Sequence, residues 1–249
     1  MRYIVAVVIP ARWASTRFPG KSLYLLAGKP MIQHVWEHCC RCTQIDDVYV
    51  ATDDERIFQA AKHFGAKVFR TSHTHLTGTD RVAEVASCLP KVTHIVNVQS
   101  DVPALDPRLL YRFVKVLRHS KHLEMVTAAT PFPEFADPSD PCMVKVIVNH
   151  QGYALYFSRS AVPFTQCKEE RSCRLLHIGV YGFKKSFLLK FASWQPSSLE
   201  KCEKLEQLRA LENGAQIQVL LTQHPNVSVD TPGDAKNAEA TLLRQKDLL

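Results

Sequence analysis

A loop near the amino terminus carries several side chains of the kinds that bind phosphate. The segment from Pro10 to Lys21 reads P-A-R-W-A-S-T-R-F-P-G-K and follows an apolar run that ends at Ile9. Its cations and hydroxyls are Arg12, Arg17, Lys21, Ser15 and Thr16. Fixed cations and backbone N–H groups can hold a triphosphate and stabilise the charge that develops on its α-phosphorus. The alternative is a solvated surface loop with scattered charges. The Walker pattern G-x-x-x-x-G-K-[ST] is absent, which argues against an ATPase.

A carboxylate stands at the end of a predicted buried strand. The apolar stretch Val96–Val98 continues through Gln99 and Ser100 to Asp101. In open α/β sheets, ligands bind beyond the carboxyl ends of the strands, so we expect Asp101 at the same edge as the Pro10–Lys21 loop. A carboxylate there can bind Mg²⁺, which takes oxygen ligands from carboxylates and substrate phosphates. The alternative is that Asp101 only begins the following turn.

A second carboxylate precedes the last predicted helix, in Val229-Asp230-Thr231-Pro232. Proline in the first turn is a common way for a helix to begin, so a purely structural role would explain this segment. Asp230 becomes a candidate second metal ligand if the fold returns it to the edge that carries Asp101.

Short apolar strands alternate with amphipathic segments in the first half of the chain. The pattern predicts strands at 3–9, 47–52, 67–70 and 94–98, and helices at 30–42, 54–64, 78–88 and 107–118. In the first helix, Met31, Val35, Cys39 and Cys42 share one side. This alternation predicts βαβ units and a mostly parallel sheet, and the fully apolar first strand suits a sheet that is covered on both faces.

The second half is less regular. We expect strands at 125–130, 143–148, 153–157, 177–182 and 217–221, a polar loop at 163–175, and helices at 199–213 and 233–246. The sequence thus predicts one α/β domain over residues 1–249, with a mixed β region inserted at about 130–185.

The composition is that of an ordinary globular protein with an excess of positive charge. The formal net charge is +7, from 31 basic and 24 acidic residues. This charge favours an anionic partner, whether a nucleotide, a nucleic acid or a membrane surface. A nucleic-acid-binding protein remains the non-enzyme alternative, although the basic residues are dispersed and no DNA- or RNA-binding signature occurs.

The sequence predicts a cytoplasmic protein. The apolar run before Pro10 is too short for a signal peptide, and no run approaches the roughly 18–20 residues that span a bilayer. The eight cysteines are expected to be free thiols, as in a reducing compartment.

The segment His34-Val35-Trp36-Glu37-His38 fits the zinc-protease pattern H-x-x-E-H. Two histidines four residues apart share a helix face and could bind zinc, with the glutamate as base. Because no clear third ligand follows, we regard a metalloprotease as a remote alternative.

Several motifs, in order along essentially the whole chain, resemble those of the 3-deoxy-manno-octulosonate cytidylyltransferases (CMP-Kdo synthetases). The matching segments are Pro10 to Lys21, Thr77 to Arg81, Val96 to Pro103, Ala154 to Arg159, His177 to Phe183, Leu205 to Arg209 and Val229 to Pro232. The resemblance implies a Rossmann-like sheet of the nucleotide-diphospho-sugar transferase type. It also implies a homodimer with a role in lipopolysaccharide biosynthesis.

The reaction implied by the resemblance is a Mg²⁺-dependent attack of the anomeric hydroxyl of 3-deoxy-D-manno-octulosonate (Kdo) on the α-phosphate of CTP. Its products are CMP-Kdo and pyrophosphate. A related enzyme that acts on 8-amino Kdo or sialic acid is the nearest alternative, although the A-S-T-R form of the first loop favours Kdo.

The resemblance also implies roles for individual residues. Asp101 and Asp230 would bind Mg²⁺, while Arg12 and Lys21 would hold the triphosphate, and these four form the predicted catalytic set. The predicted nucleotide-binding residues are Pro10, Ala11, Arg12, Ser15, Arg17, Lys21, Thr77, Gly78, Arg81 and Gln99. The predicted sugar-binding residues are Gln99, Arg159, His177, Tyr181, Glu206 and Gln207.

Helical spacing supports part of the predicted sugar-binding set. If 199–213 is one helix, Glu203, Glu206 and Gln207 are neighbours on its surface. Without the resemblance, such residues would be interpreted as a solvated face, and His177 as a core histidine.

The chain departs from the family pattern at a few positions. Ser100 stands where the family has Gly, Val102 where it has Glu, and Asp80 where it has Glu, and the 163–173 loop matches poorly. If the family glycine needs a positive φ, Ser100 is expected to be strained by about 1 kcal/mol or more.

Overall fold

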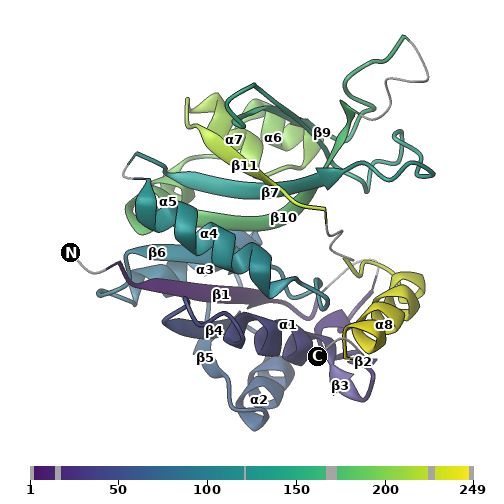
Figure 1. Ribbon diagram of the computed structural model, residues 1–249. Coiled ribbons are helices and arrows are strands. Elements are labelled where there is room, and N and C mark those ends of the chain that lie inside the picture. The colour runs from purple at the N-terminus through teal and green to yellow at the C-terminus, as the bar shows by residue number, and fades with distance from the viewer. Residues whose placement is uncertain (1–2, 15–17, 121, 167–172, 224–227, 247–249) are drawn as a thin grey trace. The chain divides into compact units, whose positions relative to one another are not determined.

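The computed structural model describes residues 3–14, 18–120, 122–166, 173–223 and 228–246, with the side chains of 245 and 246 excepted (Figure 1). The chain forms two compact units, one of residues 1–114 with 226–249 and the other of residues 115–225. Each unit is described by itself. Among the described residues, no helix is both long and apolar enough to cross a membrane.

The first unit contains a parallel sheet. Its strands are β1 (Val5–Ala11), β4 (Asp47–Thr52), β5 (Lys67–Arg70) and β6 (His94–Val98). They lie in the order β6-β1-β4-β5, and every pair is parallel. All of β1 is buried, as predicted for a strand covered on both faces. A short antiparallel pair, β2 (Leu25–Leu26) and β3 (Lys29–Pro30), lies outside this sheet.

The helices of this unit follow the predicted alternation. They are η1 (Lys21–Leu23), α1 (Met31–Cys40), α2 (Glu55–His63), α3 (Gly78–Ser87) and α8 (Pro232–Lys246), with α4 (Pro107–His119) running across the boundary of the units. Side-chain oxygens cap two of them, because Asp54 accepts from the N–H of Arg56 and Thr77 from that of Asp80. The predicted apolar side of α1 is buried.

The second unit has a mixed sheet. Its strands are β7 (Met125–Pro131), β8 (Lys145–Val148), β9 (Ala154–Ser158), β10 (Leu175–Lys184) and β11 (Ile217–Leu221). β11 is parallel to β7, whereas β10 is antiparallel to both β7 and β8, and β9 is antiparallel to β8. Residues 167–172 of the predicted polar loop lie outside the described residues.

Two boundaries differ from the sequence prediction in ways that matter for the site. The first strand begins at Val5, later than predicted. It continues to Ala11, because its pairing with β4 extends to Ala11 and Thr52. Pro10 and Ala11 therefore belong to the strand, and the loop proper begins at Arg12.

The prediction of one helix over 199–213 is wrong. The segment forms α6 (Ser198–Glu203) and α7 (Gln207–Glu212), and Lys204 between them has a left-handed backbone with φ 53°. The Arg159 side chain donates hydrogen bonds to the carbonyls of Glu203 (2.7 Å) and Lys204 (3.3 Å), which a continuous helix would use internally. Glu203, Glu206 and Gln207 consequently do not share one helix surface. The other helices of this unit include α5 (Lys185–Ser193).

A buried ion pair joins the two short helices. The Glu200 carboxylate accepts hydrogen bonds from Arg209 at 2.7 Å and 2.6 Å, and both side chains are less than a tenth exposed. The same carboxylate closes the capping box of α6 with Ser197. Helices this short need such tertiary contacts to persist.

We expect Glu200→Ala to lower the free energy of unfolding by about 3–5 kcal/mol, because it removes the carboxylate that balances the charge of the buried Arg209 guanidinium. Urea denaturation followed by circular dichroism measures this change. Lys67→Met, which removes an exposed pair with Asp47, serves as the control and should cost less than about 1 kcal/mol. The double variant Glu200→Ala/Arg209→Met should recover part of the loss; a double variant no more stable than Glu200→Ala would contradict this interpretation.

Candidate active site

The loop that follows β1 is closed at its base by a glycine and a tryptophan. The N–H of Gly20 donates to the carbonyl of Trp13 at 3.0 Å, and Gly20 has a left-handed φ of 71°. A Cβ at Gly20 would lie only 2.8 Å from the Trp13 ring, so both the conformation and the contact require glycine. The Arg56 guanidinium also lies over the Trp13 ring, with its Cζ atom 3.4 Å from the ring centroid. This closure fixes the start of η1, where Lys21 stands.

Lys21 joins the two carboxylates that the sequence singles out. Its Nζ lies 2.6 Å from Asp101 Oδ2 and 3.1 Å from Asp230 Oδ1, and it donates a third hydrogen bond to the carbonyl of Val229 at 3.1 Å. The structure thus brings together three of the four predicted catalytic residues, although Asp230 lies 129 positions after Asp101 (230 − 101). Their roles as ligands of a metal stay predictions.

The segments that carry the carboxylates are fixed to one another by backbone and side-chain hydrogen bonds. The N–H of Val229 donates to the carbonyl of Asp101 at 2.8 Å. Asp234, in the first turn of α8, accepts from the N–H groups of Asp230 (3.1 Å) and Thr231 (2.8 Å). A small apolar cluster that includes Val229, Ala235 and Leu26 lies beside them. The backbone segments that carry the two carboxylates are therefore held in place.

Ser100 contributes to this arrangement instead of straining it. Among the described residues, only Ala27 and Lys204 are non-glycine residues with a positive φ, so the strain considered for Ser100 does not arise. Its buried hydroxyl lies 3.1 Å from that of Ser22, which directly follows Lys21. This hydroxyl pair connects the segment that carries Lys21 to the segment that carries Asp101. Val102 is buried, as suits an apolar side chain.

Electrostatics keep the Lys21 side chain charged. Burial alone would lower the pKa of Lys21, but the carboxylates of Asp101 and then Asp230 outweigh it and raise that pKa above its ordinary value. The Lys21 ammonium is therefore charged at neutral pH.

The predicted nucleotide-binding residues fall into several groups. Pro10 and Gln99 both lie beside Gly78, since a Cβ built there would be 3.4 Å from each side chain. The Gln99 amide donates to Asn97 at 3.1 Å. Ala11 is buried in β1 and Arg12 is exposed just beyond it. Thr77 caps α3, while Ser15 and Arg17 lie outside the described residues.

Arg81 is held by protein groups rather than facing solvent. Its side chain is buried, with its guanidinium hydrogen-bonded to the Thr71 hydroxyl and 3.2 Å from the Asp53 carboxylate. These contacts connect α3 to the end of β4, and sequence reasoning did not identify Asp53 as the partner of Arg81. The nucleotide-binding role of Arg81 stays a prediction.

The predicted sugar-binding residues belong to the second unit. His177 and Tyr181 are neighbours on β10, with ring centroids 5.5 Å apart. Burial and then the charge of the Glu206 carboxylate raise the pKa of Tyr181 well above its ordinary value. Next to Glu206 in the chain, Gln207 is buried, and its Nε2 has no hydrogen-bond partner among the described residues. These side chains form a partly polar cluster.

Arg159 is more strongly tied to the protein than the sequence indicates. Besides Glu203 and Lys204, its guanidinium donates to the carbonyl of Pro141 at 2.5 Å. The carboxylate of Glu203 in turn accepts from the Arg159 N–H at 2.9 Å and from Ser158 at 2.7 Å. Glu203 therefore orients Arg159, a role that spacing along the sequence does not reveal.

The H-x-x-E-H segment is used structurally in α1. His34 Nε2 lies 2.7 Å from the carbonyl of Leu26, and Glu37 accepts from Lys29 at 2.7 Å. Burial lowers the pKa of His38 to about 4. No group of three or more possible metal ligands from His, Cys, Asp and Glu occurs in the part of the chain that the structure describes.

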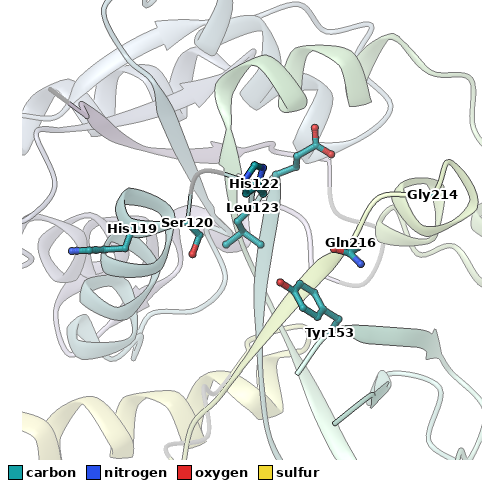
Figure 2. Close-up of a pocket in the computed structure, with 8 residues that line it drawn as sticks. His119, Ser120, His122, Leu123, Tyr153, Gly214 and Gln216 are labelled. Carbon is teal, nitrogen blue, oxygen red and sulfur yellow. The ribbon is translucent and has the colours of Figure 1, made fainter. Parts of the chain in front are cut away.

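A separate cavity in the second unit contains none of the predicted site residues (Figure 2). It has a volume of about 680 Å³ and is lined by residues that include His119, His122, Tyr153 and Gln216. It lies at the amino ends of β7 and β11, whereas His177 pairs with Ala129 toward the carboxyl end of β7. The cavity is therefore distinct from the cluster around His177.

His177 is expected to be neutral throughout the physiological range. Its Nε2 lies 2.9 Å from the Thr127 hydroxyl, which itself donates to backbone carbonyls, so Nε2 carries the proton. Burial lowers the pKa of His177 to about 3. As the pH falls, the His177 imidazole therefore takes up its second proton near pH 6.5 in the unfolded chain, well before it does so in the folded protein.

The free energy of unfolding should accordingly fall as the pH drops from about 6.5 toward 3. Replacing His177 by Gln should make this decline shallower, because one proton fewer is bound on unfolding. Urea denaturation of both proteins at pH 5 and pH 7 measures the difference. Equal pH dependence in the two proteins, or an NMR titration that gives His177 an ordinary pKa, would contradict the assignment.

Comparison with known proteins identifies the family. A cytidylyltransferase family model matches residues 6–217. The 3-deoxy-manno-octulosonate cytidylyltransferase of Geobacter sulfurreducens is 47% identical over 240 residues, which cover 92% of this chain and 96% of that protein. The enzyme of the same name from Myxococcus xanthus is 46% identical over 94% of this chain and 95% of its own.

Solved structures agree with the sequence relatives. The structure of CMP:2-keto-3-deoxy-manno-octonic acid synthetase complexed with CTP is 35% identical, covers 97% of this chain and 99% of its own, and superposes with a TM-score of 0.91. A 4-diphosphocytidyl-2C-methyl-D-erythritol synthase from Anaerococcus prevotii, 14% identical with a TM-score of 0.66, shares the fold. The predicted nucleotidyltransferase fold is confirmed. The chain belongs to the cytidylyltransferase family, and within it to the 3-deoxy-manno-octulosonate cytidylyltransferases.

Proposed function

We propose that this protein transfers CMP from CTP to Kdo and releases pyrophosphate. The observation that carries the proposal is the convergence of Asp101 and Asp230 on one cation, the Lys21 ammonium, at the carboxyl ends of β1 and β6. Nucleotide binding at this edge is the general rule for open α/β sheets. The sequence relatives carry the name of this activity.

The donor set of the site fits Mg²⁺. Two carboxylates with fixed backbones already face a single positive charge, and Mg²⁺ is commonly bound by one or two carboxylates together with substrate phosphates. Bound by Asp101 and Asp230, Mg²⁺ would neutralise phosphate oxygens and activate the attacking hydroxyl.

The nucleotide would lie between the Pro10–Lys21 loop and the start of α3. Arg12, exposed beyond β1, is placed to pair with phosphate oxygens, and Lys21 offers a second cation. Pro10, Gly78 and Gln99 form one corner of this edge, where the small Gly78 leaves space that a side chain would fill. Fixed cations at this edge would stabilise the transition state most at the transferred phosphoryl group, because charge develops there.

The sugar would be bound by residues of the second unit. The cluster of His177, Tyr181, Glu206 and Gln207 offers a phenol, an imidazole and a buried amide donor with unused hydrogen-bonding capacity. Arg159 keeps N–H donors beyond those that its three carbonyl partners use, so it can pair with the carboxylate of an acidic sugar. We also propose that residues 1–249 make up one nucleotidyltransferase domain, with the β region at about 130–185 inserted in it.

The cellular location, the oligomeric state, the pathway and the cofactor are proposed on the basis of the same function. We propose a cytoplasmic homodimer that supplies activated Kdo for lipopolysaccharide synthesis, with Mg²⁺ as cofactor. The names of the relatives support the sugar assignment.

The proposal is tested by pyrophosphate release from purified protein with CTP, Kdo and Mg²⁺, with each component omitted in turn. Release that needs all three, with CMP-Kdo as the product, is expected. Release only with 8-amino Kdo or sialic acid would correct the sugar and keep the chemistry. No release with any nucleotide and acidic sugar from a folded sample would refute the proposed function.

Asp101→Asn should lower turnover by at least about 100-fold with the fold intact, as expected for roughly 2.7 kcal/mol of lost transition-state stabilisation. The matched control is Asp47→Asn, because Asp47 begins β4 at the opposite edge of the same sheet. Steady-state turnover and circular dichroism of both variants measure the effect. Turnover of Asp101→Asn close to that of the wild type would remove Asp101 from the mechanism.

Arg159→Ala should raise the KM for Kdo by about tenfold or more, in line with the roughly 1.5–3 kcal/mol of a charged hydrogen bond, and leave the KM for CTP nearly unchanged. Because Arg159 also holds the carbonyls after α6, thermal unfolding should be recorded for the same variant. Arg159→Lys keeps the charge without the planar fork and should give an intermediate KM. Equal increases in both KM values would contradict a sugar-specific role.

A further inference from the structure

The position between the two carboxylates is already filled by a side chain of the protein. An ammonium has three N–H donors, and those of Lys21 are used by Asp101 (2.6 Å), Asp230 (3.1 Å) and the carbonyl of Val229 (3.1 Å). The Lys21 side chain is only 13% exposed. Its stem therefore leads into the site and its charged end occupies the place where the two carboxylates converge.

We infer that Lys21 is the resident counter-ion of this site and keeps divalent metal ions out of the nucleotide-free protein. Metal then enters only together with a triphosphate, whose oxygens take over the Lys21 ammonium and release Asp101 and Asp230. This inference rests on the proposed function for the identity of the nucleotide. It adds an order of binding that the proposed reaction does not by itself require.

Charge and geometry both support the displacement. A divalent ion placed beside the Lys21 ammonium would face a like charge within a few ångströms, a distance at which like charges near a protein surface repel each other strongly. With Lys21 in place, the ammonium and the two carboxylates together have a single net negative charge. That charge attracts a hydrated metal ion only weakly. A triphosphate brings several negative charges and reverses this balance.

Lys21 is also the part of the cluster that can move. The backbone at Asp101 and Asp230 is held by hydrogen bonds with Val229 and Asp234, and each carboxylate is joined to that backbone by a single methylene. The Lys21 backbone is fixed as well, by its N–H to the carbonyl of Phe18 at 3.2 Å and by the adjacent Ser22–Ser100 pair. Its four-carbon stem, in contrast, is flexible and can carry the ammonium to a neighbouring phosphate without any change of the loop.

Binding of Mn²⁺ to the nucleotide-free protein, followed by electron paramagnetic resonance, tests the inference. Lys21→Met should bind Mn²⁺ at least about tenfold more tightly than the wild type, a difference of about 1.4 kcal/mol. Lys29→Met is the matched control, because it removes a lysine that pairs with a single carboxylate of Glu37 in the same unit, and it should match the wild type. Adding Asp101→Asn to Lys21→Met should abolish the gain, which locates the ion. If Lys21→Met binds Mn²⁺ no more tightly than the wild type, the inference is wrong.

Asp101→Asn in the wild-type background gives a second test of the inference, and this test does not depend on the folding of Lys21→Met. With Lys21 excluding the metal, this substitution should leave the Mn²⁺ affinity of the nucleotide-free protein unchanged within about twofold, a difference of about 0.4 kcal/mol. Tight Mn²⁺ binding by the wild type that Asp101→Asn abolishes would overturn the inference. None of these measurements uses CTP or Kdo, so their outcome is separate from that of the pyrophosphate assay.

Discussion

The hydrogen-bonded ion cluster of Lys21, Asp101 and Asp230 is the constraint on which the rest of the site depends. Two carboxylates on segments distant in the sequence would repel each other at neutral pH, and one partly buried ammonium keeps them together. It joins the loop after β1, the end of β6 and the start of α8. The parallel sheet makes this possible, because its strands β1 and β6 bring their carboxyl ends to the same edge.

Neighbouring residues hold the segments of the Lys21, Asp101 and Asp230 cluster in position. Trp13 and Gly20 close the first loop, Ser22 and Ser100 connect its end to the Asp101 segment, and Asp234 fixes the segment of Asp230. They explain how a site can tolerate Ser100 in place of the family glycine, because the serine replaces conformational freedom with a buried hydrogen bond.

Local sequence patterns predicted the helices and strands well where the spacing of hydrophobic residues and the order of elements determine them. The order of strands and helices in the first unit and the placing of Asp101 at a strand end follow from alternation and from the general rule for parallel sheets. The break at Lys204 was not predictable, because it depends on Arg159, a residue 45 positions earlier, taking the helix carbonyls. The burial of Arg81 against Asp53 and the Ser22–Ser100 pair were missed for the same reason. Each joins side chains that only the tertiary structure brings together.

The central claim is that Asp101 and Asp230 form a cation site that Lys21 occupies until a nucleotide and a metal arrive. Crystals of the protein grown with CTP and Mn²⁺, measured at a wavelength where manganese scatters anomalously, test it most directly. The expected result is a manganese peak shared by the two carboxylates, with the Lys21 ammonium moved away from both and onto a phosphate. A manganese ion bound elsewhere on the nucleotide, with Lys21 still hydrogen-bonded to Asp101 and Asp230, would contradict the claim.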